Sequence, residues 1–80
     1  MSTYKVEISK KFGTFRAKFG EATAFSSADE TELKDMDEVV NFVKKNAAGL
    51  NLEEGDSVVF REIAYTSIGD LTREVKRAPY

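Results

Sequence analysis

The chemistry open to this 80-residue chain is limited first by two residue types that it lacks. It contains no histidine and no cysteine, which removes the commonest zinc ligands, the commonest general base and the thiolate nucleophile. Serine and threonine are frequent, but no histidine is present to activate them, and no G-x-S-x-G turn occurs. The five glycines stand singly, so they form no G-x-G-x-x-G or Walker phosphate loop. The sequence therefore predicts a protein that is not an enzyme.

Paired carboxylates are the remaining groups with the chemistry to bind a cation. Asp35 with Glu38, and Glu53 with Glu54, offer the oxygen ligands that hard cations prefer, but they lack the spacing of a calcium loop. Acids at helix starts and in turns more often satisfy backbone N–H groups. We therefore expect no metal site and no cofactor.

Charge is segregated along the chain, although the net charge is only −2. Residues 1–20 carry five cations against one acid, residues 21–56 carry ten acids against three lysines, and residues 57–80 are nearly neutral. The molecule is electrically two-sided if these blocks occupy different surfaces. The basic block, with its aromatics, has the composition of surfaces that stack single-stranded bases. The acidic block instead resembles a nucleic-acid surface that attracts a basic protein groove.

A helix predicted over residues 33–50 organises the rest of the chain. Its apolar residues recur in steps of three and four, which places them on one side of a helix. Asp35 is expected to cap it, Glu38 to complete a capping-box pair, and Gly49 to end it in the left-handed conformation. The predicted core stripe is Leu33, Met36, Val40, Val43, Ala47 and Leu50, with Val39 beside it.

Two strands are predicted before this helix, over residues 4–9 and 14–19, where apolar and polar residues alternate. Gly13 accepts positive φ, so a short antiparallel hairpin joins them. Phe12 is expected near its tip, and two interpretations stay open. The ring packs back onto the sheet edge, which we favour, or it docks into a partner.

Residues 57–65 predict a third strand with large apolar side chains at both odd and even positions. A single helix covers only one sheet face, so some of Phe60, Ile63 and Tyr65 are expected on the open face. Three possibilities stay open for what packs on that face. They are residues 21–34, a second copy of the chain, and a different partner.

A fourth strand is predicted over Leu71–Arg77, with Leu71 and Val75 pointing inward and a turn at residues 67–70 before it. The order β-β-α-β-β predicts a single α+β domain over residues 1–80. One helix packs on a four-stranded, mainly antiparallel sheet whose strand order is open.

The sequence favours a small non-catalytic protein that binds another protein, a homodimer being one arrangement. Aromatic anchors would fill a desolvated patch, with arginines at its rim. In the alternative, Lys5, Arg16 and Lys18 neutralise the phosphates of a single-stranded nucleic acid. The predicted partner-binding residues are Phe12, Arg16, Lys18, Phe60, Arg61, Ile63 and Tyr65.

No apolar signal region follows Met1, and the longest run of bulky apolar residues is Val58–Phe60. We therefore expect no membrane insertion and a cytoplasmic location.

One hexamer, Ala64–Gly69 (AYTSIG), resembles a stretch in one class of small phage inhibitors of CRISPR nucleases. It covers six of the 80 residues and the remainder does not align, so no site residue is carried over. The resemblance implies a phage-type or regulatory inhibitor that occupies a partner's surface.

Overall fold

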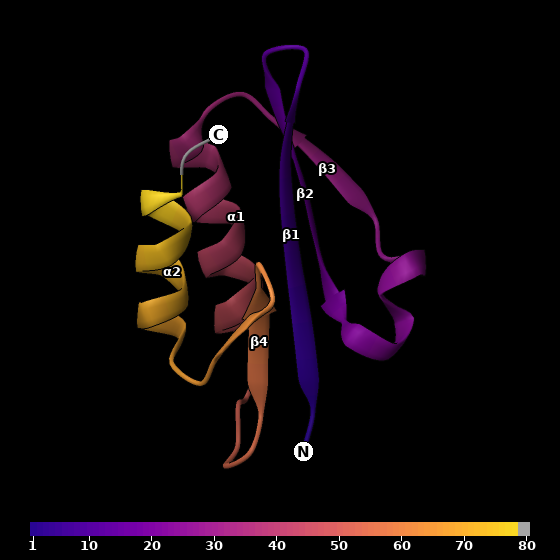
Figure 1. Ribbon diagram of the computed structural model, residues 1–80, viewed down its shortest axis with the longest axis vertical. Coiled ribbons are helices and arrows are strands. Elements are labelled where there is room, and N and C mark those ends of the chain that lie inside the picture. Colours follow the sequence, from indigo (N-terminus) through magenta and orange to yellow (C-terminus); the bar gives the residue numbers. More distant parts are fainter. Residues whose placement is uncertain (79–80) are drawn as a thin grey trace.

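The computed structural model describes residues 1–78, in which a sheet carries two helices on one face (Figure 1). The predicted α+β class is confirmed, with five strands in place of four and two helices in place of one. In chain order the elements are β1 (Thr3–Lys11), β2 (Thr14–Glu21), the 3₁₀ helix η1 (Ala22–Ser27), β3 (Glu30–Leu33), α1 (Met36–Ala48), β4 (Ser57–Phe60), β5 (Ile63–Tyr65) and α2 (Ile68–Arg77).

The strand order is β3-β2-β1-β4-β5. The pairs β1–β2, β2–β3 and β4–β5 are antiparallel, which confirms the mainly antiparallel sheet, and only β1–β4 is parallel. The parallel pair needs a crossover connection, and α1 provides it. The long strand β1 therefore lies at the centre of the sheet.

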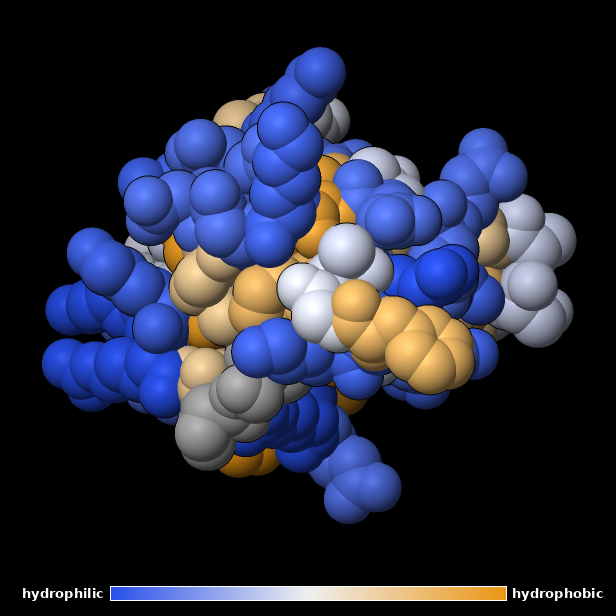
Figure 2. Space-filling model, turned by 90° about the horizontal axis from the view of Figure 1, so that it is seen from above, coloured by the Kyte–Doolittle hydropathy of each residue, from blue (hydrophilic) through white to orange (hydrophobic). Residues whose placement is uncertain are grey.

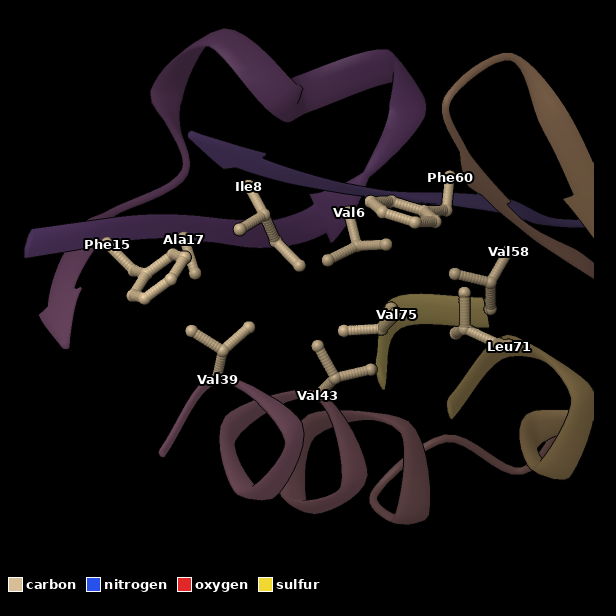
Figure 3. Close-up of a cluster of buried hydrophobic side chains, with 10 residues drawn as sticks. All are labelled: Val6, Ile8, Phe15, Ala17, Val39, Val43, Val58, Phe60, Leu71 and Val75. Carbon is tan, nitrogen blue, oxygen red and sulfur yellow. The ribbon is translucent and has the colours of Figure 1, made fainter. Parts of the chain in front are cut away.

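The core lies between the sheet and both helices. Val39 and Val43 of α1 point toward the side chains of β1 and β2, while α2 places Leu71 and Val75 beneath β4 (Figure 3). The cluster comprises Val6, Ile8, Phe15, Ala17, Val39, Val43, Val58, Phe60, Leu71 and Val75.

The start of α1 has the predicted pair of capping side chains, but Glu38 accepts from the residue before the N-cap Asp35, so the pair is a variant of the capping box. The Asp35 carboxylate accepts a hydrogen bond from the Glu38 N–H at 2.9 Å, and the Glu38 carboxylate accepts one from the Lys34 N–H at 2.8 Å. Gly49 follows the helix as predicted, but its φ of −75° is right-handed, so the expected left-handed cap is wrong.

The buried stripe of α1 is offset from the predicted one. Val39, Val43 and Ala47 are fully buried, whereas Val40 is only partly buried. The predicted stripe through Val40 and the observed stripe through Val39 both follow helical spacing. The side chains of the sheet pack against the stripe through Val39.

The prediction of a strand over Leu71–Arg77 is wrong, because this segment belongs to α2. The Ser67 hydroxyl accepts a hydrogen bond from the Asp70 N–H at 3.4 Å and begins the helix. Leu71 and Val75 do point inward, as neighbours one helical turn apart.

The predicted third strand is two strands, β4 and β5, joined by the tight turn Arg61–Glu62. Phe60 pairs with Ile63 across this turn, and directly paired residues point to the same side of a sheet. Ile63 and Tyr65 therefore share the helix-covered face with Phe60, and the prediction that some of the three lie on the open face is wrong.

Part of the open face is covered by the chain itself. Phe25 of η1 is only 8% exposed but lies outside the main core cluster. The Nζ atoms of Lys5 and Lys18 lie 4.9 and 4.8 Å from its ring centroid. A Cβ atom on Gly20 would lie 3.2 Å from that of Ala28, so glycine permits this close packing. The 3₁₀ helix thus covers the open face over β1 and β2, and not over the third strand, for which a cover was expected.

We expect Val43→Asp to abolish cooperative unfolding. An unpaired buried charge costs several kcal/mol, against a total stability of about 5–15 kcal/mol, and Val43 is fully buried. Val40→Asp should cost less, because Val40 is partly exposed, and Lys44→Ala should be nearly silent. Thermal melts followed by circular dichroism compare the three variants, and a normal Val43→Asp melt would contradict the core assignment.

We expect the loop around Asp56 to lose stability in acid. The backbone N–H groups of Glu53 and Ser2 donate to the Asp56 carboxylate at 2.9 and 2.6 Å, which holds its pKa below the usual value. The stabilisation is therefore present above the unfolded pKa of about 3.9 and is lost as the pH falls through the folded pKa.

The Asp56→Asn variant checks this assignment. It should melt below wild type at pH 7, because an amide replaces the charged acceptor, and the difference should shrink below about pH 4. A difference in melting temperature that stays constant from pH 7 to pH 3 would show that the charge of Asp56 is not responsible.

Candidate partner-binding site

Phe12 is the most exposed apolar residue among the predicted partner-binding residues. It occupies the turn between β1 and β2, at the end where this hairpin extends past the rest of the sheet (Figure 1). Its side chain is 92% exposed. The favoured interpretation, a ring packed on the sheet edge, is therefore wrong. Figure 2 views the molecule from this end and shows hydrophobic surface standing among hydrophilic side chains.

The backbone of this turn disfavours phenylalanine. Phe12 has a φ of +53° and Gly13 one of +82°, and Lys11 pairs with Thr14 across them. This is the geometry of a two-residue type I′ turn, whose first position prefers Asn, Asp or Gly. A left-handed conformation costs an ordinary residue about 1–2 kcal/mol. The chain thus holds an aromatic ring in water at a position that another residue would fit better.

Two lysines accompany the ring. Lys11 Nζ lies 5.6 Å from the centroid of Phe12, and Lys10 Nζ lies 5.5 Å from that of Phe15. Both lysines are exposed, and neither has a carboxylate partner among the described residues. Residues 10–13, named here the hairpin tip, therefore combine one apolar group with two uncompensated charges.

Arg16 and Lys18 lie on the open sheet face, as predicted, but both already have partners. The Arg16 guanidinium lies 3.2 Å from the Glu30 carboxylate and 3.9 Å from that of Glu32, both on β3. Lys18 lies over the ring of Phe25. Carboxylates of β3 thus neutralise Arg16, whereas Lys18 contacts a ring and has no carboxylate partner among the described residues.

The remaining predicted residues lie on β4, on β5 and in the turn between these strands, at the opposite edge of the sheet from β3. Phe60 is 3% exposed and belongs to the core, whereas Ile63 is 57% exposed on the edge strand β5. Arg61 is exposed, with a φ of +54°. Together with half-buried Tyr65 they line a shallow pocket of about 190 Å³ against the end of α2.

The phenol of Tyr65 is perturbed by this position. Burial raises its pKa, and the Glu74 carboxylate of α2 raises it further. A phenol with an ordinary pKa of about 10 is already neutral at physiological pH, so Tyr65 offers a hydroxyl donor beside exposed Ile63.

Sequence reasoning missed the groove between the two helices, because α2 was predicted as a strand. The groove holds about 750 Å³, and Val40 and Ile68 are among its lining residues. Lys44, Arg73 and Lys76 also line it, with Asp37 as the acid among its lining residues. The signal that would have found it is the helical spacing of Ile68, Leu71 and Val75.

Neither a cluster of metal ligands nor a membrane-spanning helix is found among the described residues. Within residues 1–78, no group of three or more acidic side chains is placed to hold a metal ion. No helix in the same range is long and apolar enough to cross a membrane. Comparison of the chain with protein-family models, with curated proteins and with solved structures found no match.

We expect Phe12→Asn to stabilise the fold. Asparagine accepts the left-handed backbone more readily than phenylalanine, and the wild-type ring makes little contact to lose. A gain of about 1 kcal/mol corresponds to a rise in melting temperature of about 4–8 °C. Calorimetry of both proteins measures this rise. A large drop in melting temperature would show that the ring supports the fold.

Proposed function

We propose that this chain is a small non-catalytic binding protein that occupies a surface of another protein through its hairpin tip. One observation carries the proposal, namely the 92% exposed ring of Phe12 at a φ of +53°. Ordinary residues held in left-handed backbone concentrate at functional sites. An aromatic side chain is also a frequent anchor of protein interfaces.

The chemistry of the tip suits a protein partner. A ring that enters an apolar pocket gains burial free energy of about 1.5–3 kcal/mol. Lys10 and Lys11 can then meet carboxylates at the rim of that pocket, where charges favour fast and specific association. The proposal extends to an inhibitor or regulatory protein in the cytoplasm that has no enzymatic activity of its own. It retains Arg61, Ile63 and Tyr65 as a second contact region.

A single-stranded nucleic acid is the second candidate ligand, favoured by the tip's pairing of lysines with an exposed ring. Bases stack on exposed aromatics, and Phe12 has the required exposure. Phe25 does not, because it is 8% exposed beneath Lys5 and Lys18. Two phosphate contacts from Lys10 and Lys11 would give a log K against log salt slope of only about −1.4, from about −0.7 per contact. The observations favour protein.

We expect Phe12→Asn to lose a partner that the wild-type protein captures. Both proteins, immobilised at equal density, are exposed to lysate of the native host, and bound proteins are quantified by mass spectrometry. Loss of a buried aromatic anchor costs about 2 kcal/mol, which corresponds to roughly 30-fold weaker binding. Lys44→Ala on α1 is the matched control and should capture the partner like wild type.

Equal capture by wild type and Phe12→Asn would refute the role of the tip. Titration with a mixed-sequence single-stranded oligonucleotide separates the second candidate. Micromolar binding at physiological salt that disappears in the Lys10→Ala/Lys11→Ala variant would assign the tip to nucleic acid. We expect no binding at that level.

A further inference from the structure

Strand β1 extends beyond its partner β4. The parallel pairing begins at Thr3 and ends at Val6, opposite Phe60, whereas β1 continues to Lys11. Residues 7–11 are paired with β2 on one side only, and no other segment of residues 1–78 pairs with them on the other. At about 3.3 Å per residue, this β1 edge (residues 7–11) is roughly 17 Å long.

The hairpin geometry fixes which backbone groups this edge presents. In a two-residue hairpin the residues next to the turn, here Lys11 and Thr14, exchange backbone hydrogen bonds, and the bonded pairs then alternate along the strands. Lys11, Ser9 and Glu7 therefore bond to β2. Ile8 and Lys10 turn both the N–H and the C=O away from β2, toward the β1 edge.

A notch lies at the Glu7 end of this edge. It lies where β4 turns into β5, holds about 240 Å³, and is lined by side chains of β1, β4 and the turn, namely Lys5, Glu7, Ile8, Phe60, Arg61 and Glu62. Ile8 and Phe60 supply apolar surface there. One water molecule takes about 30 Å³ of liquid volume, so the notch has room for a large side chain.

We propose that the β1 edge binds an extended segment of the partner protein as an added strand, in line with β4. Backbone groups of Ile8 and Lys10 form the ladder, an apolar side chain of the segment enters the notch, and acidic side chains face Lys10 and Lys11. The inference rests on the proposed function and specifies its recognition mode. A row of unpaired strand groups is a ready template for this kind of pairing.

Charge decides which segment fits. Lys5 lies 4.0 Å from the Glu7 carboxylate, so the notch end of the edge is internally compensated. Lys10 and Lys11 have no carboxylate partner among the described residues. The cations are thus concentrated at the tip end, and an acidic extended segment complements them.

A second copy of this chain fits the edge less well. Free backbone groups meet in three antiparallel registers of two β1 edges. Lys10 opposite Lys10 brings two like charges together, and Ile8 opposite Ile8 overlaps β4 further than the register that sets Ile8 opposite Lys10 of the other copy. The same register would set Phe12 of the other copy opposite Val6. Phe60 already fills that position, so the hairpin of a second copy collides with the β4–β5 turn.

The test uses random nonapeptides displayed on phage and selected on the immobilised full chain, with soluble Lys10→Pro protein present as competitor. Proline removes the N–H that faces the edge, which edge strands tolerate, together with the lysine charge that Lys10→Ala also removes. We expect enriched peptides rich in Asp and Glu. A synthetic consensus peptide should bind Lys10→Pro at least tenfold more weakly than wild type. Lys10→Ala, which keeps the N–H, should bind it more tightly than Lys10→Pro does.

Amide hydrogen exchange in the wild-type protein gives a readout that needs no variant. The peptide should slow exchange at Ile8 and Lys10 at least tenfold, and leave Glu7 and Ser9 unchanged because β2 already protects them. Failure to enrich any peptide, or equal protection at all four amides, would overturn the inference. So would a wild-type dimer in sedimentation that Lys10→Pro dissociates, since a second copy would then occupy the edge.

Failure of this inference is distinguishable from failure of the proposed function. Capture from host lysate that Phe12→Asn abolishes and Lys10→Pro leaves intact would keep the hairpin tip as the contact and reject strand addition. Capture that both variants leave intact would reject both.

Discussion

Burial of the helix-facing side of β1 is the interaction on which the rest of the structure depends. Val6 and Ile8 lie over side chains from both helices (Figure 3). A fully buried valine or isoleucine contributes about 1.5–3 kcal/mol, so a few such contacts equal the whole stability of a domain this size. Because β1 also pairs with β2 and β4, this packing fixes the strand from which the hairpin tip projects.

Local signals in the sequence were sufficient for β1, β2 and the capped start of α1, but they did not predict β3, and Leu33 was expected in the helix. The alternation in β1 and β2 and the capping pair at Asp35 act within a few residues, so tertiary context does not override them. The segment Leu71–Arg77 was misread because a spacing of four, from Leu71 to Val75, satisfies both a strand period of two and a helical turn. The capping hydroxyl of Ser67 distinguishes the two, but Gly69 follows two residues later and makes residues 67–70 equally typical of a turn.

The candidate site was only partly predictable for a different reason. Arg61–Glu62 carries neither glycine nor asparagine, so nothing in the sequence marks a turn, although both residues adopt positive φ. Reading through this turn as a straight strand assigned Ile63 and Tyr65 to the wrong face. Phe12 lies near the tip of the hairpin, as predicted. Its exposure depends on how many residues of β1 extend beyond the end of β4, which is a tertiary property.

The acidic residues explain why positive charge remains only at certain places. Glu30 and Glu32 pair with Arg16, while Asp35 and Asp56 accept backbone hydrogen bonds. These carboxylates serve the fold, so a net charge of −2 does not describe the surface that a partner meets. Exposed ion pairs contribute little to stability, but they do cancel the field of the cations they contact. The proposed recognition therefore uses cations that lie beyond the reach of β3 and the loops. The lysines of the hairpin tip meet that condition because the same extension of β1 that frees its edge also carries them away from the acids.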